Sequence, residues 1–228
     1  MTERTSVRRR PSRARLHDLI LVSATVAAGT ACFRGTLPPR QFYRLSVPDS
    51  ALTAPAREAP PLSGSIAIAR YDAPGIYGTG SLIYRVGSSS YGAYPAREWA
   101  IPLGEMLARM TEQVLRRRGL TSGRILFDPG SARTDAYEWR GTIREFDEVD
   151  APTSVTASVI LAVQLVRVAD DSIVWSGTAA NVQTVIPSRS IEAVVDGLST
   201  AAVRALERLA DDASAALRRA TAAGAQSR

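Results

Sequence analysis

The chain has 228 residues, with 28 Lys and Arg against 22 Asp and Glu, and this length fits one domain with a hydrophobic core plus flanking segments. Six of the basic residues lie among the first eighteen, so the excess positive charge does not indicate nucleic-acid binding by the rest of the chain. His17 is the only histidine, which leaves the remainder without Ser-His-Asp or Cys-His catalysis and without the usual zinc ligands.

The first thirty-one residues have the layout of a secretory signal. After the basic start, the thirteen residues Leu19–Ala31 carry no charge. A basic start, a short apolar run and small residues before a cleavage site are typical of such a signal. The run is too short for a membrane span, which needs about 20 residues. A twin-arginine signal fits less well because Pro11 and Ser12 follow the paired arginines, and a basic tail before a buried helix is the alternative.

The only cysteine follows this segment directly. Gly29-Thr30-Ala31 before Cys32 resembles a bacterial lipobox, in which the cysteine thiol receives a diacylglycerol. Two or three acyl chains hold a protein stably on a membrane, whereas one binds it marginally. Lipid attachment at Cys32 would also explain a lone thiol in an oxidising compartment. Gly29 departs from the leucine that lipoboxes favour. Phe33, in place of an aspartate that favours inner-membrane retention, predicts outer-membrane delivery with the domain facing the periplasm.

The first part of the mature chain predicts short strands separated by turns. Alternation of apolar and polar residues favours strands. The segment Pro48–Gly64 contains four prolines and is typical of an extended linker. The segment YDAPGIYGTG has the proline and glycine residues of turns. The expected strands are Gln41–Val47, Ser65–Arg70, Ser81–Val86 and a short piece at Tyr91–Tyr94.

Residues Glu98–Arg118 predict the first helix. Pro102 suits a first helical turn, where its missing N–H costs nothing, and apolar residues then recur at steps of three and four. The arginines Arg116–Arg118 complement the helix dipole at the carboxyl end, and Gly119 can cap it. A partner-binding patch is the alternative interpretation of the three arginines.

The second half of the chain predicts an antiparallel meander and a final helix. In Tyr137–Phe146, apolar and polar residues alternate, which predicts a strand with one face exposed to solvent. The expected strands Thr153–Val168 and Ile173–Val185 follow, and a turn at Asp170-Asp171 joins them. The segment Ser190–Ala222 has a helical apolar stripe that a serine can cap. The expected fold class is α+β: an antiparallel or mixed sheet with two long amphipathic helices packed on one face.

Four segments follow from these elements. Residues 1–31 are the signal peptide with the lipobox. Residues 32–63 hold the lipidated N-terminus, a short strand and the Pro-rich linker. Residues 64–222 form a single α+β domain, and residues 223–228 are a disordered tail.

Acid–base chemistry has few candidates once His17 is removed with the signal. Asp147-Glu148 and Asp211-Asp212 are adjacent carboxylates, but neighbours in sequence are usually solvated turn or helix-face charges. The sequence therefore predicts a protein that is not an enzyme and holds no cofactor and no metal. A hydrolase of envelope polymers is the contrary hypothesis, and it needs a carboxylate pair assembled by the fold.

Several motifs taken together resemble the ABC-type transport auxiliary lipoproteins, the family of the paraquat-inducible lipoprotein C component. Trp-Ala-x-Pro-Leu at a helix start is the most specific of them. The resemblance extends from Cys32 to about Leu217, and an apparent insertion at Ile76–Gly80 departs from it. The matching segments are Cys32, Phe42-Tyr43-Arg44-Leu45, Tyr71-Asp72-Ala73-Pro74, Ile83-Tyr84-Arg85, Trp99-Ala100-Ile101-Pro102-Leu103 and the strand Tyr137–Phe146.

The resemblance implies an accessory subunit, without enzymatic activity, of an MCE-type envelope lipid transport system. Its partners would be an MCE-family substrate-binding protein and the ABC permease and ATPase subunits. The acyl chains would fix the protein to the membrane, and an exposed face or edge of the sheet would meet the partner. Trp99, Tyr84 and Arg85 are the candidate contacts, with a core anchor as the alternative for Trp99. The alternative function is an envelope assembly or stabilising lipoprotein not tied to a transporter.

Overall fold

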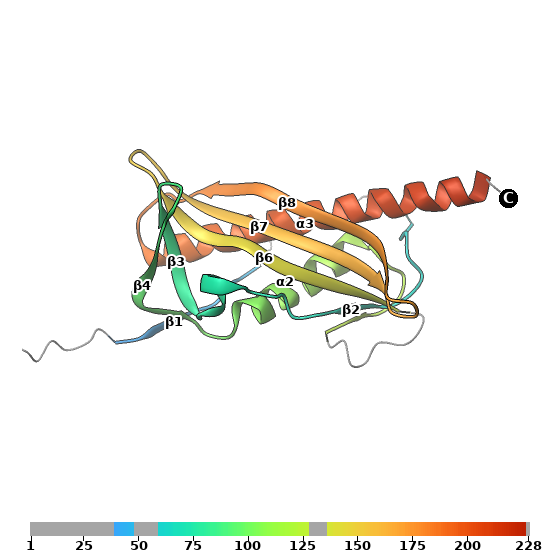
Figure 1. Ribbon diagram of the computed structural model, residues 1–228, viewed down its shortest axis with the longest axis horizontal. Coiled ribbons are helices and arrows are strands. Elements are labelled where there is room, and N and C mark those ends of the chain that lie inside the picture. Colours follow the sequence, from blue (N-terminus) through green and yellow to red (C-terminus); the bar gives the residue numbers. More distant parts are fainter. Residues whose placement is uncertain (1–38, 48–58, 128–135, 227–228) are drawn as a thin grey trace, which may run out of the picture. The chain divides into compact units, whose positions relative to one another are not determined.

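The computed structural model describes residues 39–47, 59–127 and 136–226 of the chain (Figure 1). The predicted signal peptide, the lipobox and Cys32 lie outside these residues, as do residues 48–58 of the predicted linker. From Arg40 onward the described residues belong to one unit.

The antiparallel meander predicted for the second half of the chain is confirmed. It consists of β6 (Tyr137–Asp150), β7 (Val155–Arg167) and β8 (Ser172–Val185), paired in that order. Asp171 adopts a positive φ of 53° in the predicted turn between β7 and β8. β6 continues four residues beyond the expected end at Phe146. A bulge between Ile143 and Glu145 shifts the alternation, so that Phe146 again faces the core.

The N-terminal strands pair with the opposite edge of β6 and make the sheet mixed. β2 runs parallel to the first residues of β6, and β3 runs parallel to its last residues. β4 is antiparallel to β3, and β1 is parallel to β4. The sheet has eight strands, so the α+β class is confirmed in its mixed form. These strands are β1 (Gln41–Tyr43), β2 (Ile66–Ile68), β3 (Ser81–Val86), β4 (Ser90–Trp99) and the unpredicted β5 (Ile125–Leu126).

The first helix begins later than the sequence predicted. α2 spans Leu103–Arg118, and the preceding residues through Trp99 belong to β4. Pro102 occupies the N-cap position and not the first helical turn. The residue before a proline is biased away from helical conformation, which explains why the strand and the helix separate here. The predicted end is confirmed, since Gly119 caps α2 in the left-handed region with a φ of 62°.

The last helix begins almost where the sequence predicted and ends later. α3 spans Ile191–Gln226, and the hydroxyl of Ser190 accepts a hydrogen bond from the N–H of Ala193 at 3.2 Å. The helix continues beyond the expected end at Ala222 because its last residues are rich in alanine, the best helix former.

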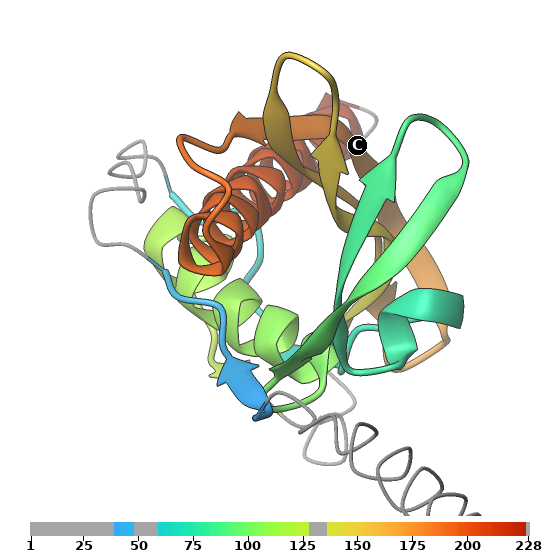
Figure 2. The same ribbon diagram turned by 90° about the vertical axis from the view of Figure 1, so that its left-hand side faces the viewer.

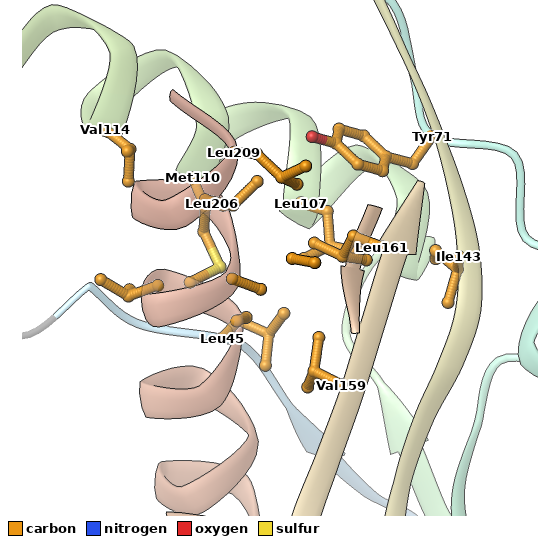
Figure 3. Close-up of a cluster of buried hydrophobic side chains, with 14 of the residues drawn as sticks. Leu45, Tyr71, Leu107, Met110, Val114, Ile143, Val159, Leu161, Leu206 and Leu209 are labelled. Carbon is orange, nitrogen blue, oxygen red and sulfur yellow. The ribbon is translucent and has the colours of Figure 1, made fainter. Parts of the chain in front are cut away.

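Both helices pack on one face of the sheet, as predicted (Figure 2). At the end of α2, the guanidinium of Arg118 forms ion pairs with Glu207 at 3.0 Å and Asp211 at 3.3 Å, both on α3. One of the three terminal arginines therefore joins the two helices. The core between helices and sheet is drawn in Figure 3, and its labelled residues include Leu107, Met110 and Val114 of α2, Leu206 and Leu209 of α3, and Val159 and Leu161 of β7.

Replacing Gly104 with alanine is expected to destabilise the domain. Gly104 lies in the first turn of α2, and its carbonyl oxygen accepts a hydrogen bond from the N–H of Tyr71 at 3.1 Å. A Cβ here would lie 2.1 Å from the backbone oxygen of Tyr71, which no side-chain rotation can relieve. Overpacking of this kind costs about 1–3 kcal/mol. The free energy of unfolding, measured by urea denaturation, is expected to fall by that amount.

Gly197 in α3 is the matched control for this substitution. A Cβ at Gly197 meets Cγ1 of Ile186 at 3.0 Å, and that flexible side chain can move. Gly197→Ala is expected to change the unfolding free energy by less than about 1 kcal/mol, because alanine also favours the helix. Equal effects of the two substitutions would contradict the close approach described at Gly104.

Candidate functional site

Trp99, the last residue of β4, lies in the core of the domain. Its side chain is 6% exposed, and its ring meets the ring of Phe146 edge-on with centroids 6.0 Å apart. The backbone N–H of Trp99 donates a hydrogen bond to the carbonyl oxygen of Gly80 at 2.7 Å. This burial favours the alternative interpretation of Trp99 as a core anchor.

Tyr84 belongs to an aromatic cluster on the hairpin formed by β3 and β4. Its ring centroid lies 5.0 Å from that of Tyr94, and the ring packs over Gly92, where a Cβ would come within 2.4 Å of it. The neighbouring guanidinium of Arg85 lies 5.8 Å from the ring centroid of Tyr91. Tyr91 and Val86 are the large apolar side chains that this hairpin exposes.

Arg85 is held by two carboxylates of β6. Its Nε donates to Oδ2 of Asp147 at 2.9 Å, and its Nη2 donates to Oε2 of Glu145 at 3.0 Å. The Tyr77 hydroxyl donates to the other oxygen of Asp147 at 2.9 Å, and the Ser158 hydroxyl donates to Glu145 at 3.1 Å. The network joins β3, β6, β7 and the 3-10 helix η3 (Gly75–Gly78). The position of Arg85 is therefore fixed from within the domain.

Asp147 and Glu148 are both buried, so the prediction that they form a solvated pair is wrong. As successive residues of a strand they point to opposite sides, and each side is covered. Burial raises the pKa of both carboxyls above their ordinary values. The Tyr94 hydroxyl donates to Glu148, while Asp150 pairs with Arg189 at 2.9 Å.

The second adjacent pair behaves as predicted. Asp211 and Asp212 are exposed on α3, although Asp211 also pairs with Arg118. In the described ranges, side chains of His, Cys, Asp and Glu do not gather in threes as a metal site would require.

A groove of about 510 Å³ lies beside the start of α2. Residues 70–73, 77–80 and 99–104 line it, so two of the motifs named in the sequence analysis meet here. The N–H of Asp72 donates to the carbonyl oxygen of Gly141 at 2.8 Å, which fixes the first motif against β6. Ile101 and Arg70 are exposed at the groove. The lining of the groove therefore combines apolar side chains with the exposed Arg70.

Tyr71 supports the floor of this groove. Its hydroxyl is 2.9 Å from Oγ1 of Thr111 and accepts a hydrogen bond from Nε1 of Trp139 at 2.9 Å. Burial raises the pKa of Tyr71 to about 12, so the hydroxyl stays protonated at neutral pH. Tyr71 is therefore a structural residue in this position.

The groove could not be predicted from the sequence, because segments that are distant along the chain meet there only in the folded domain. The apparent insertion at Ile76–Gly80 overlaps η3 and forms one wall, with Tyr77 buried beneath it. An aromatic residue inside a glycine-rich turn was the available signal that this segment packs against the domain.

The face of the sheet opposite the helices is polar, as the alternation predicted. A second groove of about 460 Å³ crosses β6, β7 and β8 there. Its side chains include Arg140, Thr142, Arg144, Gln164 and Thr178. Arg140 pairs with Glu138 at 2.6 Å and Asp171 at 3.0 Å.

Comparison with known sequences gives one family. The sequence pattern of the family described as "ABC-type transport auxiliary lipoprotein component" matches residues 43–214. No curated protein matches the chain significantly. Among the helices of the described ranges, none has the length and apolar character needed to cross a membrane.

Two solved structures share this fold, and a third is less similar. The crystal structure of protein XCC0632 from Xanthomonas campestris, described as a DUF330 family member, is 19% identical with a TM-score of 0.66 and covers 79% of this chain and 98% of its own. An uncharacterized protein, 12% identical, has a TM-score of 0.54 and covers 77% and 99%. A putative lipoprotein from Caulobacter crescentus CB15, 18% identical, has a TM-score of 0.38 and covers 50% and 83%.

Proposed function

Because the chain belongs to the family of ABC-type transport auxiliary lipoprotein components, we propose that it is a lipid-anchored accessory subunit of an MCE-type envelope lipid transport system. It acts by protein docking, without catalysis, and its partners are an MCE-family substrate-binding protein and the ABC permease and ATPase subunits. The observation that carries the proposal is the family match over residues 43–214, which includes most of the described domain.

The anchor in this proposal is Cys32. Acyl chains on its thiol hold the domain at the outer membrane, facing the periplasm. The tether is the segment between Cys32 and β1, because β1 already pairs with β4 and the Pro-rich segment therefore connects two strands of the sheet. Two or three chains bind a membrane stably, so no spanning helix is required.

The docking surface in this proposal is the tip of the hairpin formed by β3 and β4. Val86 is 50% exposed and Tyr91 43% exposed there, and exposed apolar side chains on a rigid support are typical of interaction sites. Tyr84 and Arg85 support the hairpin from within, through the aromatic cluster and the ion pairs to β6. Trp99 fixes the other end of β4.

Co-purification tests the proposal. The full chain, tagged at its C-terminus and extracted from membranes in mild detergent, is expected to retain MCE and permease subunits. Val86→Asp would bury a charge in the interface and is expected to reduce the retained MCE protein by about tenfold, equivalent to about 1.4 kcal/mol. Ile173→Asp is the matched control, since Ile173 is 55% exposed on another hairpin.

Three results would count against this proposal. A purified chain without either subunit would contradict the transport assignment, and capture of unrelated envelope proteins alone would favour the assembly-lipoprotein alternative. Equal loss with Val86→Asp and Ile173→Asp would contradict the hairpin as the docking surface.

A further inference from the structure

The edge strand β1 presents an apolar side chain between two arginines. Tyr43 and Leu45 face the domain, where Leu45 is 8% exposed. Because successive side chains of an extended segment alternate, Arg40, Phe42 and Arg44 face outward. Phe42 is 61% exposed, and both arginines are exposed.

A second apolar residue lies next to this strand. The N–H of Ala100 donates to the carbonyl oxygen of Tyr43 at 2.7 Å, which places the following residue, Ile101, beside the end of β1. Ile101 is 37% exposed. The term β1 patch denotes the surface formed by Arg40, Phe42, Arg44 and Ile101. Glu98 is the acidic neighbour of the patch, 3.6 Å from Arg40, and the patch keeps a net positive charge.

The position of β1 in the chain limits how far the patch can lie from the proposed anchor. Arg40 is eight residues after Cys32. Eight residues span at most about 28 Å even when fully extended. α3, with 36 residues, is about 54 Å long. The tether is therefore shorter than the domain's own final helix, so β1 stays within about 28 Å of Cys32 while other parts of the domain can lie farther away.

From these observations we infer that the β1 patch rests on the phospholipid surface in which the acyl chains of Cys32 are inserted. The inference depends on the lipid attachment that is part of the proposed function. Phe42 and Ile101 enter the boundary between head groups and acyl chains, where apolar and aromatic side chains are favoured. Arg40 and Arg44 bind the phosphates of anionic phospholipids, which attract basic residues close to the surface. The patch thereby fixes the orientation of the domain on the membrane.

A spectroscopic reporter in the patch tests this inference. In the lipidated chain the thiol of Cys32 is blocked, so an introduced cysteine is the only one that a fluorophore can label. The full chain with Ile101→Cys is labelled and reconstituted in vesicles of phosphatidylcholine and phosphatidylglycerol, with and without quencher-bearing lipid. Ile173→Cys is the matched control, because it is exposed and lies near the turn between β7 and β8, at the other end of the domain from β1 (Figure 1).

Quenching at position 101 by more than half, with little quenching at position 173, is the expected result. Adding Phe42→Asp to the Ile101→Cys chain is expected to abolish the quenching while the protein stays with the vesicles. Replacing phosphatidylglycerol by phosphatidylcholine is expected to reduce the quenching at position 101 of the Ile101→Cys chain. Equal quenching at 101 and 173 would overturn the inference, as would a reporter at 101 that is unquenched by lipid but shielded by an added MCE protein.

Mass spectrometry of the same sample separates this inference from the proposed function. An unquenched reporter on a chain whose Cys32 carries lipid would overturn the membrane role of the patch alone. An unmodified Cys32 would overturn the anchor in the proposed function and, with it, the inference built on the tether.

Discussion

Replacing Arg85 with methionine is expected to destabilise the domain by about 3–5 kcal/mol, because it removes one partner of a buried ion pair. Asp147 is fully buried, and the side chain of Arg85 is 15% exposed. Without the guanidinium, Tyr77 remains as a donor to Asp147, and Glu145 loses its ion-pair partner. Urea denaturation of the purified chain measures the loss.

The pH dependence of this loss has a definite sign. Burial already raises the pKa of Asp147 above its unfolded value, and removal of Arg85 raises it further. The folded variant therefore binds a proton more readily than the unfolded chain, and its stability falls as the pH rises through the folded-state pKa. The cost of Arg85→Met is expected to be larger at pH 8 than near pH 5. A cost that is independent of pH would contradict the role of the buried charge.

Two controls isolate the charge. Arg85→Met combined with Asp147→Asn is expected to recover part of the loss, because no unpaired carboxylate remains at that position. Arg109→Met removes an arginine whose side chain is 57% exposed in a pair with Glu105. Its expected cost is less than about 1 kcal/mol, as for other surface pairs. A similar cost for Arg85→Met and Arg109→Met would contradict the buried network.

Replacing Cys32 with alanine is expected to move the protein from the membrane fraction to the soluble fraction almost completely. Each buried CH₂ of an acyl chain contributes about 0.8 kcal/mol to membrane binding, so losing two or three chains removes nearly all of the affinity. Fractionation followed by washes at high salt measures the distribution. Intact-mass spectrometry of the wild-type protein is expected to show a mature N-terminus at an acylated Cys32.

Gly29→Leu serves as the control for this substitution. It brings the lipobox closer to the favoured pattern while leaving the thiol in place, so the protein is expected to remain membrane-bound. If the Cys32→Ala protein also stayed on the membrane through the washes, another segment of the chain would be the anchor.

Much of the fold could be predicted from local sequence patterns. The meander and α3 rest on strong periodicity and short turns, which depend on neighbouring residues alone. The end of α2 at Gly119 and the cap at Ser190 are likewise local. The predicted start of α2 was wrong because pairing of Trp99 with Tyr43, far away in sequence, extends β4 to Trp99, three residues before Pro102.

The candidate site was less predictable because it depends on which segments meet. The burial of Asp147 and Glu148 follows from β3, β4 and η3 covering β6, and adjacent acids give no sign of that in sequence. Tyr84 and Arg85 were singled out through a family motif, and the structure places Tyr84 against Tyr94 of the same hairpin and Arg85 against Asp147 of β6. The groove joins Tyr71 and Gly104, which only the folded chain brings together.

If the chain is secreted, as the proposed function requires, the pairing of β6 limits the order in which its sheet can form. β2 and β3 are joined through β6, and Ile66 pairs with Tyr137, 71 positions later. Such distant parallel pairings form slowly, because a long loop must close first. A chain threaded through an export channel from its amino end therefore cannot complete its sheet until β6 has crossed. During such a passage, β2 and β3 are expected to remain without their β6 partner until residues 137–150 have emerged.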